Sequence, residues 1–363
     1  MEKRNVPLDI RVLPFVLPPP KLNYGLYYRK RLHGAPAEKD LLVPAQLMLA
    51  DFREIRRVGF NGLTIVKMED VEPMLKLMKE AGMKGPVMLD VGGNPSDKVL
   101  TQAVAKARAV GLEMYVYGKD EPGNDPNLLA EQKVLSARYH SIGLKVTTAV
   151  DVRSAQRLCD AGQGLDWANL SMDADSVPYL GKLKTGNAKP VAPLMTYYWQ
   201  VYQENPTLNR LCCGFYLWES GAGGAFPFEF QEDASLLAYL RDARPTMYRA
   251  RTGGKPRVFR RWDLCYPSQE GPVSTLQWEG CREGVTDVRY LTCLDTLIQE
   301  AKRRRLGADA SRTQRDLAKV LDACSKLPQS IVVQTDPFAD PAGMEAGREK
   351  ITDLILRLES KLQ

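Results

Sequence analysis

The regular succession of a helical stretch, a glycine and a short β-type run is the feature that most constrains the fold of this chain. Five predicted helices each end at a glycine, and they span residues 42–58, 71–81, 96–110, 127–142 and 152–161. Glycine commonly closes a helix because it adopts the left-handed conformation that ends the last turn. The unit recurs every roughly 25–35 residues, the length of a helix that connects two parallel strands. The pattern therefore predicts a parallel sheet covered by helices.

The number of β-type runs selects between the two common parallel architectures. The predicted strands are residues 24–28, 62–66, 86–90, 113–117, 145–150, 167–171, 191–198 and 213–218. An open doubly wound sheet usually has fewer units and a glycine-rich phosphate loop after its first strand. Here the first run is followed by Arg29-Lys-Arg-Leu-His33-Gly34, which has no such loop. We therefore predict a closed (β/α)8 TIM barrel.

The chain divides into three predicted parts. Residues 1–21 form a proline-rich N-terminal linker, residues 22–305 the barrel, and residues 306–363 a helical extension packed on it. Helices are expected at residues 277–305, 311–326 and 341–362. The linker contains LPFVLPPP at residues 13–20. Such a stiff segment usually joins structure on both sides, so a further domain is expected upstream.

Composition excludes several function classes. There are 50 basic and 44 acidic residues, interspersed, and this net charge of +6 argues against a nucleic-acid surface. The apolar runs are far shorter than the ~18–20 residues of a membrane span. Residues 1–10 are charged and polar, so the sequence as given predicts a cytoplasmic protein, or an exported one if more chain precedes it. Seven cysteines without a CxxC, and only two histidines, predict no metal, no disulfide framework and no cofactor.

Acidic and aromatic residues dominate the carboxyl ends of the predicted strands, where barrel enzymes place their active sites. Rings stack on the apolar face of a sugar, and carboxyl groups move protons at a glycosidic oxygen. The sequence therefore predicts a carbohydrate substrate. The predicted substrate-binding residues are Trp218, Tyr197, Trp199, Tyr117, Asp90 and Glu219.

The sharpest motif is Tyr115-Val-Tyr117-Gly-Lys-Asp120-Glu121-Pro122, which places two neighbouring carboxyl groups after the fourth strand. Neighbouring acids repel, which raises the pKa of one and keeps it protonated near neutral pH. Adjacent residues do not span the ~5–9 Å that separates a conventional acid and nucleophile. They suit substrate-assisted hydrolysis, in which one acid protonates the leaving oxygen and the other orients a 2-acetamido group. The other interpretation is a solvated turn in which Asp120 caps the next helix.

Two segments resemble a known family. Asp-Glu-Pro after a tyrosine-rich fourth strand resembles the catalytic motif of glycoside hydrolase family 123, the β-N-acetylgalactosaminidases. The segment WEGCREGVTDVRYL, from Trp278 to Leu291, is similar to the signature of the related domain of unknown function 4091. Tyr266-Pro267 and LPFVLPPP also fit, and in the family the latter links an N-terminal β-sandwich to the barrel. The resemblance covers roughly residues 13–305.

The resemblance implies roles for individual residues. Glu121 would be the general acid/base and Asp120 the residue that positions the acetamido group. Trp218 would form the floor of the sugar pocket, and Tyr197 would hydrogen-bond the acetamido oxygen. The chain departs from the family in two respects: it has no counterpart of the β-sandwich, and residues 221–230 lack the tryptophan-rich run of relatives.

Other interpretations of the same residues stay open. A glycosidase without acetamido specificity would pair Glu121 with a distant acid, which would be Glu219, Asp90 or Asp151. A carbohydrate-binding barrel without turnover would keep the aromatic residues alone. Arg282, Glu283 and Asp287 could form an active cluster, but we predict that they staple a helix to the barrel by hydrogen bonds and ion pairs.

Overall fold

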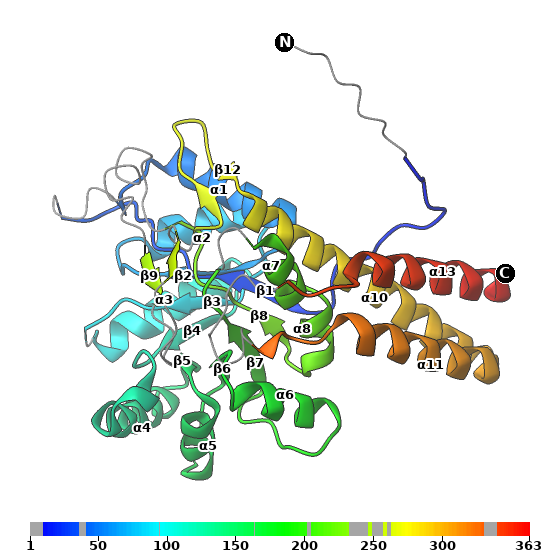
Figure 1. Cartoon of the computed structure of the whole chain (residues 1–363). Helices are drawn as coiled ribbons and strands as arrows, with labels where there is room; N and C mark the ends of the chain where they lie inside the picture. Colours follow the sequence, from blue (N-terminus) through cyan, green and yellow to red (C-terminus); the bar gives the residue numbers. More distant parts are fainter. Residues whose placement is uncertain are drawn as a thin grey trace.

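The computed structural model describes residues 10–35, 41–93, 95–162, 164–201, 205–231, 246–248, 257–259, 263–329 and 340–363. Eight parallel strands close into a barrel in the order β1 to β8 (Figure 1). They are β1 Asn23–Leu26, β2 Gly62–Ile65, β3 Val87–Leu89, β4 Met114–Tyr117, β5 Val146–Val150, β6 Trp167–Ser171, β7 Leu194–Tyr198 and β8 Gly224–Ala225. The predicted (β/α)8 barrel is confirmed.

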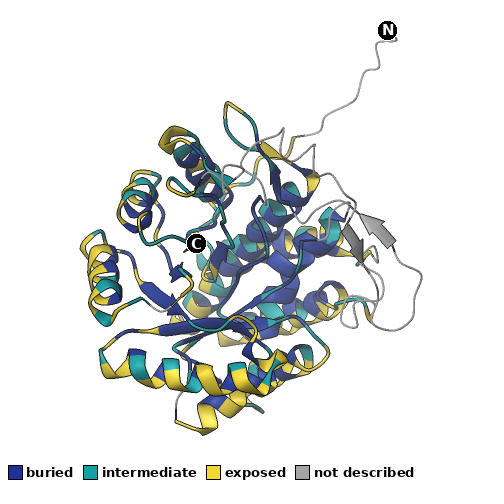
Figure 2. Ribbon diagram, turned by 90° about the vertical axis from the view of Figure 1, so that its left-hand side faces the viewer, coloured by how far each residue is buried: buried dark blue, intermediate teal, exposed yellow. Residues whose placement is uncertain are grey.

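Helices follow the strands and cover the barrel, most of them with an apolar side inward and a polar side in solvent (Figure 2), whereas the two helices between β7 and β8 are largely buried. They are α1 Ala45–Val58, α2 Val71–Glu80, α3 Asp97–Ala109, α4 Pro126–Ser141, α5 Val152–Asp160, α6 Ser176–Lys184, α7 Pro206–Cys213 and α8 Phe215–Ser220. The glycines that end the first five predicted helices all have φ between 68° and 109°. The helix–glycine pattern read from the sequence is therefore confirmed.

The eighth strand lies in a different place from the prediction. Residues 213–218, expected as a strand, are helical, and the barrel closes instead through β8, which pairs with both β7 and β1. A short apolar run is compatible with a buried helix as well as a strand, and this run belongs to the helix. The strand itself is two small residues, where a Cβ on Gly224 would lie 2.2 Å from the Asn23 carbonyl oxygen.

Aromatic side chains fill the barrel interior. Trp167 is fully buried, and its ring centroid lies 5.0 Å from that of Phe226 and 5.2 Å from that of Tyr115. Phe226 enters the barrel only because β1 and β2 carry glycine beside it. A Cβ on Gly25 would lie 1.8 Å from the Phe226 ring, and one on Gly62 would lie 2.9 Å from it. The interior is thus a packed core whose upper layer forms the base of the carboxyl-terminal face.

The remaining helices pack on one side of the barrel (Figure 1). They are α10 Leu276–Arg303, α11 Gly307–Cys324 and α13 Met344–Leu362, accompanied by the short elements η2 Pro122–Asn124, β9 Thr246–Tyr248, β10 Arg257–Phe259, β11 Cys265–Tyr266 and β12 Val273–Ser274. Helix α10 lies against α7, and α11 and α13 lie against α10. Asp287 of α10 is fully buried between Arg210 of α7 and Arg348 of α13, and Arg348 also contacts Glu283. The predicted stapling role of Glu283 and Asp287 is confirmed.

The proline-rich segment runs along α10. The Phe15 ring meets Tyr290 edge-on at 6.0 Å, and Arg289 donates to the carbonyl oxygens of Leu17 and Pro18 at 2.8 and 2.9 Å. These contacts fix the entry of the chain into the barrel. None of the helices in the described part of the chain combines the length and hydrophobicity of a membrane-spanning segment.

Candidate active site

The Asp-Glu-Pro turn after β4 has a backbone fixed by its neighbours. Lys119 N donates to Gln132 Oε1 of α4 at 2.6 Å, and Glu121 N donates to the Ala149 carbonyl of β5 at 3.1 Å. A Cβ on Gly118 would lie 2.0 Å from the same glutamine oxygen, so a side chain there would displace the amide group that holds Lys119 N. Glu121 adopts the left-handed conformation, φ 43° and ψ 54°, which is uncommon for a residue other than glycine. Such strain persists only where surrounding contacts hold it, and it clusters at functional sites.

Asp120 is held by a tyrosine from its own strand. The Tyr117 hydroxyl donates to Asp120 Oδ1 at 2.7 Å and accepts from Ala149 N at 3.0 Å. Burial raises the pKa of Asp120 and the charge of Glu121 adds to this, whereas the bond from Tyr117 lowers it. Burial and the neighbouring acid therefore oppose the ionised form of Asp120, and the bond from Tyr117 favours it. Asp125, not Asp120, caps α4 by accepting from Asn127 N at 2.8 Å, so the expected cap at Asp120 is wrong, although Asp120 and Glu121 are both exposed, as that interpretation also expected.

Glu121 is held from the other side of the barrel. Its Oε1 accepts from the Tyr198 hydroxyl at 2.5 Å and its Oε2 accepts from Asn124 Nδ2 at 2.8 Å. Tyr198 is the last residue of β7, and its pKa is raised by burial and by the bond to Glu121. Both carboxyl oxygens of Glu121 thus have fixed donors, which orient the group.

A third carboxyl group lies beside the pair. Asp90 follows β3, and burial together with the charge of Asp120 raises its pKa to about 6, against the opposing effects of Gly92 N–H and Arg29. The structure therefore brings together Asp90, Tyr117, Asp120 and Glu121, four of the residues singled out in the sequence. Substrate binding by Asp90 and Tyr117 stays a prediction.

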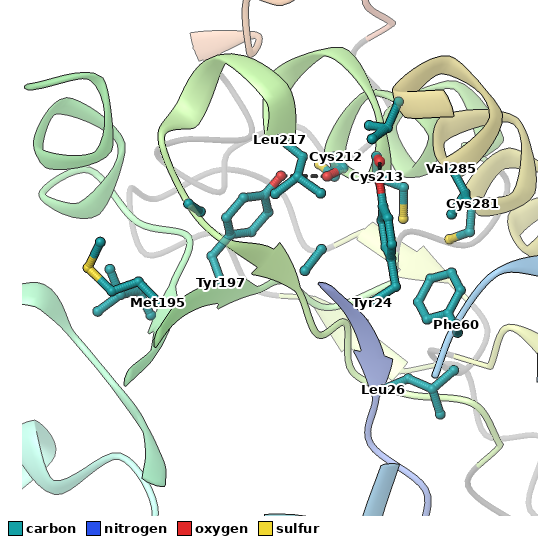
Figure 3. Packing of buried hydrophobic residues seen from close by; sticks show 14 of the residues in the cluster. Tyr24, Leu26, Phe60, Met195, Tyr197, Cys212, Cys213, Leu217, Cys281 and Val285 are labelled. Carbon is teal, nitrogen blue, oxygen red and sulfur yellow. Dashed lines mark hydrogen bonds between the residues drawn. The ribbon is translucent and has the colours of Figure 1, made fainter. Parts of the chain in front are cut away.

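Tyr197 and Trp199 lie away from this site, so their predicted placement is wrong. Tyr197 is fully buried and its hydroxyl donates to the Cys212 carbonyl of α7, as Figure 3 shows. Trp199 Nε1 donates to Asn209 Oδ1, also on α7, at 3.0 Å. Successive side chains of a strand point to opposite faces. Because Tyr198 points into the barrel, its two neighbours point out to the helices.

Trp218 and Glu219 lie at the opposite end of the barrel, which corrects their placement too. Both sit near the end of α8, where Lys184 Nζ donates to the Trp218 carbonyl at 2.9 Å and pairs with Glu219 at 3.2 Å. Helix α8 ends at Ser220 and β8 begins at Gly224, so this is the amino-terminal face of the strands. Trp218 therefore does not form the floor of a pocket at the acid pair.

Asp151 supports the turn from behind. It caps α5 by accepting from Ser154 N at 2.9 Å. A Cβ on Gly123 would lie 1.8 Å from Asp151 Oδ2, so this carboxyl group packs directly against the turn that carries Glu121.

The sequence reasoning missed Tyr27 and did not select Tyr198 or Asn169. Tyr27 directly follows β1; its hydroxyl accepts from Asn169 Nδ2 at 3.0 Å, and its ring contacts Phe228 at 5.5 Å and Tyr198 at 6.3 Å. The alternation of side chains along a strand could have identified both tyrosines, because residues two apart lie on the same face. Tyr27 stands two residues after Gly25, and Tyr198 two after Thr196, so each shares the inward face.

Comparisons with known proteins assign neither a family nor an activity to the chain. No protein-family profile and no curated protein matches the chain. A candidate alpha-L-fucosidase of Bacteroides thetaiotaomicron VPI-5482 has 12% identity and a TM-score of 0.43 over 64% of this chain and 93% of that one. The GH99 endo-alpha-mannosidase of the same genus has 11% identity and a TM-score of 0.41 over 74% and 97%. A Flavobacterium johnsoniae chitobiase has 12% identity and a TM-score of 0.29 over 94% and 73%. Similarity this distant does not select one activity among the many that barrels carry.

Proposed function

We propose that the chain is a retaining glycoside hydrolase that cleaves β-linked N-acetylhexosaminides with help from the substrate's own 2-acetamido group. N-acetylgalactosamine is the first candidate sugar, as the resemblance to family 123 implies. The observation that carries the proposal is the separate support of two adjacent carboxyl groups. Asp120 is held by Tyr117 and Glu121 by Tyr198, at the carboxyl end of a barrel strand.

The two acids then have different tasks. Tyr117 occupies Asp120 Oδ1, and Oδ2 accepts from the acetamido N–H, which turns the acetamido carbonyl oxygen toward the anomeric carbon. That oxygen bonds to the anomeric carbon while the bond to the leaving oxygen breaks, and Glu121 gives its proton to the leaving oxygen. Water next attacks the anomeric carbon and gives a proton to Glu121 while the acetamido oxygen leaves. Two displacements give net retention.

One alternative keeps a specific observation in its favour. In a glycosidase that ignores the acetamido group, Glu121 would act with a distant carboxyl group. Of the three acids considered, Asp90 lies close enough to Asp120 for the charge of Asp120 to raise the pKa of Asp90. Glu219 is at the opposite end of the barrel, and Asp151 lies behind the turn.

A panel of chromogenic substrates separates the alternatives. The proposal expects release from 4-nitrophenyl β-N-acetylhexosaminides and none from the matching plain hexosides. Stepwise fluorination of the acetamido methyl should lower kcat/KM because the carbonyl oxygen becomes a poorer nucleophile, and a thiazoline mimic should inhibit. Release from plain hexosides supports the pair of Glu121 and Asp90. Binding without release from any member contradicts hydrolysis.

Variants assign the roles. Glu121→Gln should lose roughly 10²–10⁴-fold in rate toward poor leaving groups, and far less toward 2,4-dinitrophenolate, which needs no proton. Asp120→Asn should slow hydrolysis with every leaving group. Glu219→Gln, on the opposite face, is the matched control and should keep the full rate. A nearly unchanged rate in Glu121→Gln would exclude it as the acid.

A further inference from the structure

A line of hydrogen bonds crosses the barrel interior beneath the acid pair. Trp167 Nε1 of β6 donates to Thr196 Oγ1 of β7 at 2.7 Å, and Thr196 Oγ1 donates to Asn169 Oδ1 of β6 at 2.7 Å. Asn169 Nδ2 donates to the Tyr27 hydroxyl, which follows β1, at 3.0 Å. Trp167, Thr196 and Asn169 are fully buried.

The line continues to the carboxyl group of Asp120. The Tyr27 hydroxyl lies beside that of Tyr117, close enough for each group to shift the pKa of the other, and Tyr117 donates to Asp120 Oδ1 at 2.7 Å. The Tyr117 hydroxyl also accepts from Ala149 N at 3.0 Å, so its proton and one lone pair are used and the second lone pair is left for Tyr27. The contacts therefore connect β6, β7 and β1 to the turn after β4.

The chemistry at the two ends fixes the direction of every bond. An indole N–H only donates, and a carboxylate only accepts. Thr196 accepts from Trp167 and donates to Asn169 Oδ1, and Asn169 presents its amide N–H to Tyr27. Because Tyr117 donates its proton to Asp120, a hydrogen bond between the two tyrosines takes its proton from Tyr27. Each donor thus points toward Asp120.

We propose that this line, which we call the donor relay (Trp167, Thr196, Asn169, Tyr27 and Tyr117), keeps Asp120 ionised and oriented for the acetamido group. Asn169 and Thr196 are then positioning residues that act through Tyr117. The catalytic meaning rests on the proposed function, but the effect on Asp120 does not.

The surroundings of Asp120 explain why such a relay is needed. Asp90 after β3 and the adjacent Glu121 are negative when ionised, and burial also favours the neutral form of Asp120. Tyr27 and Tyr198 face it as neutral phenols, and Arg29 lies near Asp90. The bond from Tyr117 is the contact that lowers the pKa of Asp120. Hydrogen bonds in a chain polarise one another, so each donor behind Tyr117 strengthens this bond.

Carbon-13 NMR of protein labelled at the aspartate carboxyl carbon measures the effect without any substrate. The Asp120 signal is the one that Asp120→Asn removes. We expect its midpoint to rise by about one pH unit in Tyr117→Phe, because a bond to a charged group is lost. Loss of a more distant donor should raise it by less, roughly 0.2–0.5 unit, with Tyr27→Phe above Thr196→Val.

Thr147→Val is the matched control. Thr147 lies on β5, on the same inward face as Ala149, and its buried hydroxyl has no hydrogen-bond partner among the described residues. It should leave the midpoint unchanged, and Thr196→Ser should restore the wild-type value. If Thr196→Val fails to fold, Tyr27→Phe, at a partly exposed residue, carries the test.

Equal midpoints in Thr196→Val and Thr147→Val would overturn the relay, as would a rise that Thr196→Ser does not reverse. In an active enzyme, the acid limb of kcat/KM should move to higher pH by the same amount. If the NMR midpoint of Asp120 rises in these variants but the protein releases nitrophenol from no N-acetyl substrate, the relay stands and the proposed function is rejected. If the protein hydrolyses N-acetyl substrates but the midpoint of Asp120 does not rise in Tyr27→Phe and Thr196→Val, the proposed function stands and the relay is rejected.

Discussion

Replacing Asp287 by alanine tests what holds the C-terminal helices on the barrel. Asp287 has no exposed surface, and it accepts from Arg210 Nε at 2.8 Å, Arg210 Nη2 at 3.1 Å and Arg348 Nε at 2.6 Å. Asp287→Ala therefore removes three charge-assisted hydrogen bonds and leaves the guanidinium groups of Arg210 and Arg348 without the carboxylate between them. Arg210 keeps Glu345 and Arg348 keeps Glu283, each in a position built for more partners.

The expected loss follows from the burial of the network. Removing one partner of a buried ionic network costs about 3–5 kcal/mol, because the remaining charge loses its compensation. Folded proteins have a free energy of unfolding of only ~5–15 kcal/mol, so this loss is a large share of the total. For a chain of this size it corresponds to a fall in Tm of roughly 4–7 °C.

Urea unfolding followed by circular dichroism and tryptophan fluorescence measures the loss. Asp295→Ala is the control on the same helix. Asp295 is 28% exposed and pairs with Lys21, itself 45% exposed, so the control should cost only about 0–1 kcal/mol. If Asp287→Ala were no less stable than Asp295→Ala, the buried network would contribute no more than a surface pair, and the argument would be refuted.

Two further predictions concern the site. Tyr198→Phe removes a hydrogen-bond donor from Glu121 and should lower kcat/KM by roughly tenfold. Tyr197→Phe should keep kcat/KM and lower the free energy of unfolding by about 1 kcal/mol, because its hydroxyl binds the Cys212 carbonyl of α7. The opposite pattern would show that Tyr197, and not Tyr198, faces the site. The folded-state pKa of Asp90, about 6, exceeds the ~3.9 of an unfolded chain, so its contribution to stability is present below pH ~4 and is lost as pH rises through about 6. Asp90→Asn should flatten the curve of unfolding free energy against pH by at most about 2–3 kcal/mol across this range, and an unchanged slope would exclude Asp90 as the titrating group.

The sequence predicted the architecture well because the architecture has local signals. Each of five helices ends in a glycine with positive φ, and a single residue type marks that conformation. The eighth strand had no such signal. It is two residues long and contains Gly224, whose role is to let the Asn23 backbone approach. The richer apolar run nearby, residues 213–218, has strand-like composition but is buried as a helix between barrel and α10.

The direction of side chains was harder to predict, because the barrel strands are buried on both faces and show little alternation. In β7 the end of the strand offers Tyr197, Tyr198 and Trp199, which composition does not distinguish. Thr196 shows which face of β7 is inward, because a buried hydroxyl needs hydrogen-bond partners. Its partners, Trp167 and Asn169, lie inside the barrel. Tyr198 shares its face and therefore points at Glu121.

The same reasoning has a physical limit on β5. Thr147 and Thr148 are adjacent, both are buried, and they point to opposite faces, so polarity alone leaves that strand undecided. The Thr148 hydroxyl donates to the Lys119 carbonyl in the turn before Asp120, whereas that of Thr147 has no partner among the described residues. A buried polar residue therefore indicates a face only where a second polar residue is in reach of it. In this barrel the residues that satisfy this condition, Thr196 and Asn169, are also the ones whose hydrogen bonds lead to Asp120.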